Sequence, residues 1–82
     1  MTNNDLIKKY CIDPTLVGRT NNLSCSAGTL YSYAEPIARY KDGTFLVSRK
    51  KWSVTTTRHV NTLLGILSQR GNTYTVTVDR LM

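Results

Sequence analysis

The stretch TLYSYAEPIARYKDGTFLVSRKKW, residues 29–52, decides the fold, because it places a tight turn between two runs of strand-forming residues. Asp42 followed by Gly43 is a strong short-range signal for a hairpin turn, since glycine accepts a positive φ without a steric penalty. Pro36 has no amide hydrogen to donate to a neighbouring strand, so we expect a bulge or an edge position there. The stretch therefore predicts a β-hairpin around residues 41–43.

An amphipathic helix is predicted after the hairpin, over residues 55–69. Four apolar side chains recur at the i, i+3, i+4, i+7 spacing of one helix face: Val60, Leu63, Leu64 and Leu67. A hydroxyl of Ser53 or Thr55 can cap the start of this helix, and Arg70 followed by Gly71 marks its end.

A last strand is predicted in TYTVTVD, residues 73–79, where three apolar side chains alternate with threonines. This alternation is typical of a strand with one buried face, here formed by Tyr74, Val76 and Val78. The simplest arrangement that buries all of these apolar faces is a three-stranded antiparallel sheet with the amphipathic helix packed across it.

The first 28 residues give weaker signals. A short helix is predicted in DLIKKY, residues 5–10, with Asn3 or Asn4 as its N-cap, whereas residues 18–28 are rich in Asn, Ser and Gly and predict a loop. A chain of 82 residues is long enough for one small domain. We therefore expect a single α+β domain over residues 1–82, with a variable N-terminal segment, 1–28, and a strand–strand–helix–strand core, 29–82.

The chain is strongly basic, with eleven Lys and Arg against five Asp and Glu and a formal charge of +6. Such a charge attracts phosphates, acidic protein faces or anionic lipid. The amino terminus has no apolar leader-like run, and no uncharged stretch approaches the roughly 18 residues of a membrane span. We expect a cytoplasmic protein that does not enter a membrane.

The sequence contains no recognisable motif for a catalytic site or a metal site. Cys11, Cys25 and His59 stand in no recognisable nucleophile–base motif, and the five acidic residues are scattered. The glycine-rich phosphate loops of nucleotide-binding proteins are absent. The two cysteines have no ligand cluster around them, so reduced thiols are expected rather than a zinc site, with a disulfide as the alternative in an extracellular chain. We expect no enzyme activity, no cofactor and no metal.

The candidate binding site is the segment RKKWSVTTTRH, residues 49–59, where cations gather at the predicted strand-to-helix junction. Its proposed partner-binding residues are Arg49, Lys50, Lys51, Trp52, Arg58 and His59. A tryptophan beside cations can stack on a nucleic-acid base or anchor a protein contact. The same segment also fits a structural role, in which Trp52 belongs to the core, hydroxyls cap the helix and the cations protect a strand end from unwanted pairing.

Residues 32–63 resemble an uncharacterised family of small phage-encoded proteins that carry two short segments, S-Y-x-x-P-I-A and aromatic-S-x-T-T-x-x-H. The first segment corresponds here to Ser32, Tyr33, Pro36, Ile37 and Ala38. The second corresponds to Trp52, Ser53, Thr55, Thr56 and His59. The resemblance implies an origin in a phage or mobile element, and it supplies no activity because none is assigned to that family.

Charge and resemblance together favour a non-enzymatic binding protein. Small phage proteins include inhibitors of host defence such as anti-CRISPR proteins, so we expect an inhibitor that engages a host protein or a protein–nucleic-acid complex in the host cytoplasm. A positively charged chain has the wrong sign to mimic DNA. The alternative is a nucleic-acid-binding protein that contacts the phosphate backbone of DNA or RNA. An unpaired edge on the last strand also predicts a homodimer.

Overall fold

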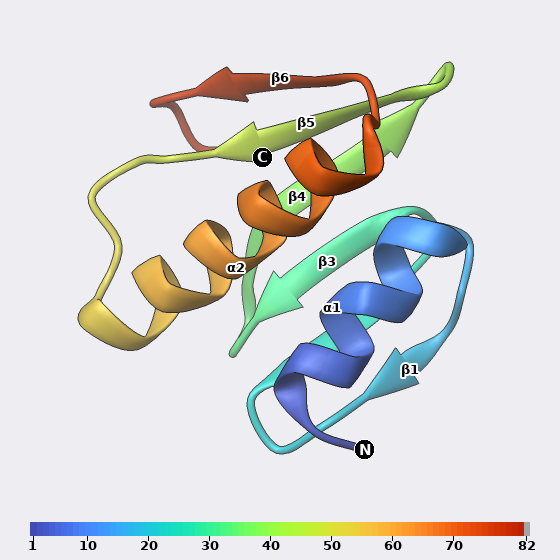
Figure 1. The fold of residues 1–82 in the computed structure, drawn as a ribbon. Helices are drawn as coiled ribbons and strands as arrows, with labels where there is room; N and C mark the ends of the chain where they lie inside the picture. The colour runs from blue at the N-terminus through green and yellow to red at the C-terminus, as the bar shows by residue number, and fades with distance from the viewer. Residues whose placement is uncertain (82) are drawn as a thin grey trace.

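Two helices cover one face of a six-stranded sheet in a computed structural model that describes residues 1–81 (Figure 1). The elements in chain order are α1 (Asn3–Ile12), β1 (Gly18–Arg19), β2 (Leu23–Ser26), β3 (Thr29–Ser32), β4 (Glu35–Lys41), β5 (Thr44–Ser48), α2 (Val54–Arg70) and β6 (Tyr74–Thr77). The two helices pack against each other and enclose the core between themselves and the sheet. Within residues 1–81, no helix lies on the opposite face of the sheet (Figure 1).

The strands follow one another across the sheet in sequence order. Neighbours from β1 to β5 are antiparallel, whereas β6 lies parallel to β5 after the chain has crossed over through α2. The expected three-stranded antiparallel sheet is therefore wrong, although the domain is of the α+β class. The predicted order already placed a helix before the last strand, but the consequence for strand direction was missed: α2 carries the chain back along the sheet, so β6 runs parallel to β5.

The extra strands come mainly from the segment that was predicted to be loop. Residues 18–28 contain β1 and β2, because Leu23 and Cys25 alternate inward over the four residues of β2. The small residues of this segment form the turns between strands, as at Ala27 and Gly28, which have φ values of 51° and 85°. A further turn at Tyr33, with φ of 59°, divides the first predicted strand into β3 and β4.

The hairpin between β4 and β5 confirms the prediction from Asp42 and Gly43. Both residues have positive φ, 53° and 80°, and Lys41 pairs with Thr44 across the turn, as expected for a two-residue type I′ loop. The pairing of β3 with β4 shifts register next to Pro36, which confirms the predicted bulge.

The long helix also forms where it was predicted. Ser53 is its N-cap and accepts a hydrogen bond from the Thr56 backbone N–H at 3.3 Å, and Gly71 ends it in the left-handed region with φ of 72°. Val60, Leu63 and Leu67 are buried. Leu64, which was placed on the same face, is only half-buried at the margin of the core.

The N-terminal helix is an integral part of the core. Thr2, and not Asn3 or Asn4, is its N-cap, because the Thr2 hydroxyl and the Asp5 carboxylate bond each other's backbone N–H in a capping box. The helix buries four side chains: Leu6, Ile7, Tyr10 and Cys11. The hydroxyl of Tyr10 donates to the carbonyl of Gly28 at 2.7 Å, which ties α1 to the turn before β3.

The last strand lies at the edge of the sheet, beyond both helices (Figure 1). Tyr74, Val76 and Val78 were predicted to form a buried face, but they are 36%, 42% and 75% exposed. Tyr74 and Val76 pair with Phe45 and Val47, whose side chains face the helices. α2 contacts Tyr74 at this edge, where Ser68 Oγ lies 2.8 Å from the Tyr74 hydroxyl, but it does not bury the three side chains.

Candidate functional site

The exposed part of the predicted site follows the end of β5. The backbone N–H of Arg49 donates to the carbonyl of Thr77 at 2.6 Å, so the chain is still held beside β6 as it leaves the strand. Arg49 and Lys51 are exposed in the loop that leads to α2, and Arg58 is exposed on the second turn of that helix. These three cations are free to meet a partner.

Trp52 anchors this loop to the body of the domain. Its indole Nε1 donates to the carbonyl of Ser48 at 3.0 Å, and its ring is partly buried against the core. The Nζ of Lys50 lies 4.7 Å from the ring centroid, which is the geometry of a cation–π contact. These contacts are those expected for the structural role of Trp52, and Lys50 lies against one side of its ring, while the binding role of Trp52 stays a prediction.

His59 lies in the interior, whereas its neighbour Arg58 is exposed. Its ring is 7% exposed, and its Nδ1 lies 2.9 Å from Ser32 Oγ. Ser32 Oγ lies 3.0 Å from Thr56 Oγ1, and His59 Nε2 lies 3.5 Å from the side-chain amide of Asn3. Burial lowers the pKa of His59, so the ring is neutral near pH 7. His59 therefore joins β3, α1 and α2 and does not face a partner.

The buried cluster also unites the two segments on which the family resemblance rests. Ser32 belongs to the first segment, and Thr56 and His59 belong to the second. In this chain the hydrogen bonds of Ser32 with Thr56 and with His59 join the two segments in the interior. Their shared role is to fix α2 on the sheet.

Ser32 and His59 do not form an accessible nucleophile–base pair. A serine beside a histidine is the first half of a nucleophile–base pair, but the side chain of Ser32 is 0% exposed and no substrate can reach it. Cys11 and Cys25 are free and buried, and burial raises the pKa of Cys11 to about 11 and raises that of Cys25. Thiols in this state are poor nucleophiles. Within residues 1–81, no three His, Cys, Asp or Glu side chains could hold a metal ion together.

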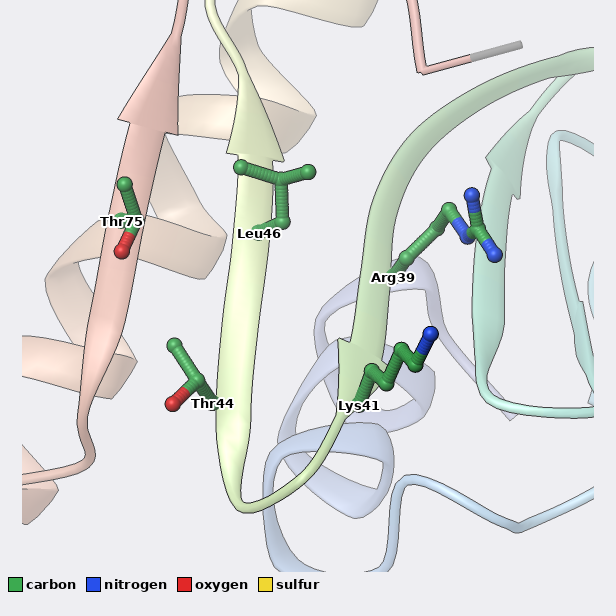
Figure 2. Close-up of a pocket in the computed structure, with 5 residues that line it drawn as sticks. All are labelled: Arg39, Lys41, Thr44, Leu46 and Thr75. Atoms are coloured by element: carbon green, nitrogen blue, oxygen red, sulfur yellow. The ribbon is translucent and has the colours of Figure 1, made fainter.

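A second cationic surface, which the sequence analysis missed, lies on the helix-free face of the sheet (Figure 2). Five side chains line a groove of about 320 Å³ there: Arg39, Lys41, Thr44, Leu46 and Thr75. The signal for it was present in IARYK, residues 37–41, where Ala38 and Tyr40 face the core and the two cations alternate outward. The sequence analysis instead predicted a site at the C-terminal end of β5, because the cations of residues 49–58 are clustered in the sequence.

The positive charge of the molecule is largely uncompensated. Arg80 is the only one of the eleven Lys and Arg with a carboxylate partner in the described part of the chain, Glu35 at 3.1 Å. Both members of that pair are substantially exposed, so the pair is screened by water. The remaining cations thus produce a positive field over the surface.

Comparison with protein families found a match over residues 6–78 to a family of unknown function, DUF8033. The match includes α1 from Leu6 onward, α2 and every strand, so most of the N-terminal segment is part of what the family shares. Comparison with curated proteins and with solved structures found no match. Neither described helix is long and apolar enough to cross a membrane.

Proposed function

The chain belongs to the DUF8033 family of unknown function, and we propose that it is a non-enzymatic protein that binds a polyanionic macromolecule through its exposed cations. The observation that carries this proposal is the uncompensated charge: in residues 1–81 a single ion pair accompanies a formal charge of +6. Unpaired Lys and Arg on a small domain favour contact with phosphate backbones, because each contact releases condensed counterions.

The surface proposed for this contact is the end of β5 and the start of α2. Arg49, Lys51 and Arg58 are exposed there, while Trp52 and Ser53 hold the loop and the helix start in place. Because the loop is fixed by its own hydrogen bonds, its cations lose little backbone entropy when they bind. We name these three residues the junction cations.

The resemblance to phage proteins supports a more specific form of the proposal. In that form the partner is a host protein or a protein–nucleic-acid complex of a defence system, and the chain acts in the host cytoplasm as an inhibitor of the anti-CRISPR kind. The basic surface would then cover an acidic face or join the bound nucleic acid. Affinity capture from a bacterial lysate separates this form from binding to free nucleic acid. A protein partner that stays bound after nuclease treatment supports the inhibitor form.

The experiment that tests the proposal is binding to random-sequence duplex DNA at several salt concentrations. We expect the logarithm of the affinity to fall linearly with the logarithm of the salt concentration, and the Arg49→Gln/Lys51→Gln variant to show a slope flatter by about 1.8, at 0.9 per lost contact. Lys8→Gln/Lys9→Gln is the matched control, because it removes the same charge from exposed positions on α1. If both double variants behave like the parent, the junction cations do not contact the ligand.

A further inference from the structure

We infer that the helix-free face of the sheet is a separate binding site and that its occupant is single-stranded nucleic acid. The site centres on the groove lined by Arg39, Lys41, Thr44, Leu46 and Thr75, which we call the sheet groove (Figure 2). The inference shares its ligand chemistry with the proposed function and rests on it in that respect. It differs in the residues, in the face of the molecule and in the class of nucleic acid.

The sheet groove is built by strand register. Arg39 pairs with Leu46, and Leu46 pairs with Thr75, so these side chains form a row across β4, β5 and β6 on one face. Lys41 pairs with Thr44 in the next row toward the hairpin turn. Figure 2 shows the five side chains in front of the sheet with the helices behind it. The groove therefore rests on the paired backbones of three strands.

The lining chemistry suits a phosphodiester chain. Arg39 and Lys41 are both exposed and lie two residues apart on one strand, about 6.8 Å along its axis, so both can contact the same backbone. The hydroxyls of Thr44 and Thr75 can donate to phosphate or sugar oxygens. Leu46 is half-buried and offers an apolar floor for a sugar or a base.

The same chemistry continues across the sheet toward β1. Thr29, which pairs with Arg39, is buried, and it pairs on its other side with the exposed Ser26. A neighbouring row on the same face holds Tyr31, Ser24 and Arg19. Tyr31 is half-buried and can present a ring on which a base stacks. This part of the face thus adds two serines, one cation and one aromatic ring.

Carboxylates are nearly absent from this face within the described residues. The only acidic residue in any strand is Glu35, at the start of β4, and it is paired with Arg80 at 3.1 Å. Asp42 lies in the hairpin turn beyond Lys41. An anionic chain laid across β3 to β6 therefore meets cations and hydroxyls with no opposing charge between Arg39 and Thr75.

The dimensions of the sheet face favour single-stranded nucleic acid over duplex DNA as its ligand. The major groove of B-DNA is about 12 Å wide and admits a helix or a two-stranded ribbon. The molecule measures 28 × 26 × 23 Å, and a face of six strands cannot enter that groove. A single strand can lie across the sheet with its bases unstacked, which is how other sheet faces hold nucleic acid.

The test is fluorescence anisotropy of labelled oligothymidylate and oligouridylate, each of about 10 nucleotides, within the usual range of single-strand site sizes. We expect Arg39→Gln/Lys41→Gln to flatten the salt slope for single strands by about 1.4, at 0.7 per lost contact. Thr75→Glu, at an exposed position, places a carboxylate in the groove and should also weaken binding. Lys8→Gln/Lys9→Gln is again the matched control, and thermal melting confirms that each variant is folded.

The outcomes separate the inference from the proposed function. If the Arg39/Lys41 variant and the Thr75 variant bind single strands like the control while the Arg49/Lys51 variant alone is weakened, the sheet-groove inference is wrong and the proposed function stands. If the groove variants lose affinity for duplex DNA more than for single strands, the assignment to single strands is wrong. If the parent binds neither oligonucleotide and no duplex at low salt, the inference and the nucleic-acid form of the proposed function both fail.

Discussion

Ser32 and His59, 27 residues apart in the chain, are joined by a hydrogen bond of 2.9 Å between Oγ and Nδ1 in the interior of the domain. Ser32 ends β3 and His59 lies in α2, so this contact fixes the helix along its axis relative to the sheet. Thr56 Oγ1, at 3.0 Å from Ser32 Oγ, completes the buried cluster. The position of α2 in turn places Arg58 and sets the path of the loop that carries Arg49 and Lys51.

Removal of the Ser32 hydroxyl should destabilise the fold. In Ser32→Ala the buried Nδ1 of His59 and the hydroxyl of Thr56 lose their shared partner, and each unsatisfied buried group costs about 1–3 kcal/mol. The free energy of unfolding in urea measures this loss. Ser26→Ala, at an exposed position on β2, is the control and should stay within about 0.5 kcal/mol of the parent. Equal stabilities for the two variants would show that the cluster contributes nothing.

The stability of the domain should fall as the pH falls below about 6.5, the ordinary pKa of histidine. Burial lowers the pKa of His59 in the folded state, so between that lowered value and 6.5 the unfolded chain binds the proton more readily. The contribution of neutral His59 is fully present above pH 6.5 and is lost as the pH drops toward the folded-state pKa. Urea unfolding at about pH 7.5 and about pH 5.5 measures the change. A His59→Gln variant should lack this dependence, and a parent whose stability is the same at both values would contradict the account.

Leu63 should be far more important to the fold than its neighbour Leu64. Leu63 is 0% exposed and Leu64 is only half-buried, although both lie on the helix face that the sequence predicts. Leu63→Ala leaves a cavity and should cost about 2–5 kcal/mol. Leu64→Ala should cost clearly less, because its side chain already touches water. Chemical denaturation of both variants compares them directly, and a larger loss for Leu64→Ala would mean that α2 is rotated about its axis.

The sequence predicted those parts of the fold whose signals are local. Asp42 and Gly43 specify the turn through their own conformations, and Ser53 and Gly71 mark the ends of α2. The short strands β1 and β2 have no such signal, since they are two and four residues long and consist mainly of small or polar residues. Their pairing depends on contacts with α1 and β3 that no local pattern encodes.

Local sequence patterns also could not predict the direction of β6 or the surroundings of the candidate site residues. Alternating residues predict a strand, but they do not specify which neighbour it joins or in which direction. For the site, clustered cations indicated residues 49–58, yet the partner of His59 is Ser32, which lies on another strand. The alternation of Arg39 and Lys41 with inward residues is visible in the sequence, but it does not reveal that both helices of residues 1–81 pack on the other face and leave these cations uncovered.

The outer edge of β6 should mediate self-association, as a homodimer. Its backbone groups on that side have no partner strand in the described chain, and residues 73–78 carry no charge and no proline to prevent pairing. Two copies paired through β6 would also join their helix-free faces into one surface. Light scattering should give about twice the monomer mass of 9.2 kDa, and Val76→Lys should restore the monomer. A mass near 9.2 kDa for the parent up to high concentration would rule the homodimer out.

The most direct test of the central claim, that the junction cations and the sheet groove bind a polyanion, is an NMR titration of the isotope-labelled chain with a short single-stranded oligonucleotide at low salt. At 9.2 kDa the backbone amides of both cationic surfaces can be followed individually. We expect shifts that saturate and that concentrate at Arg39, Lys41 and Thr75, with a second group at Arg49 and Lys51, and we expect added salt to reverse them. A spectrum that does not change, or shifts confined to α1 at Lys8 and Lys9, would contradict the account.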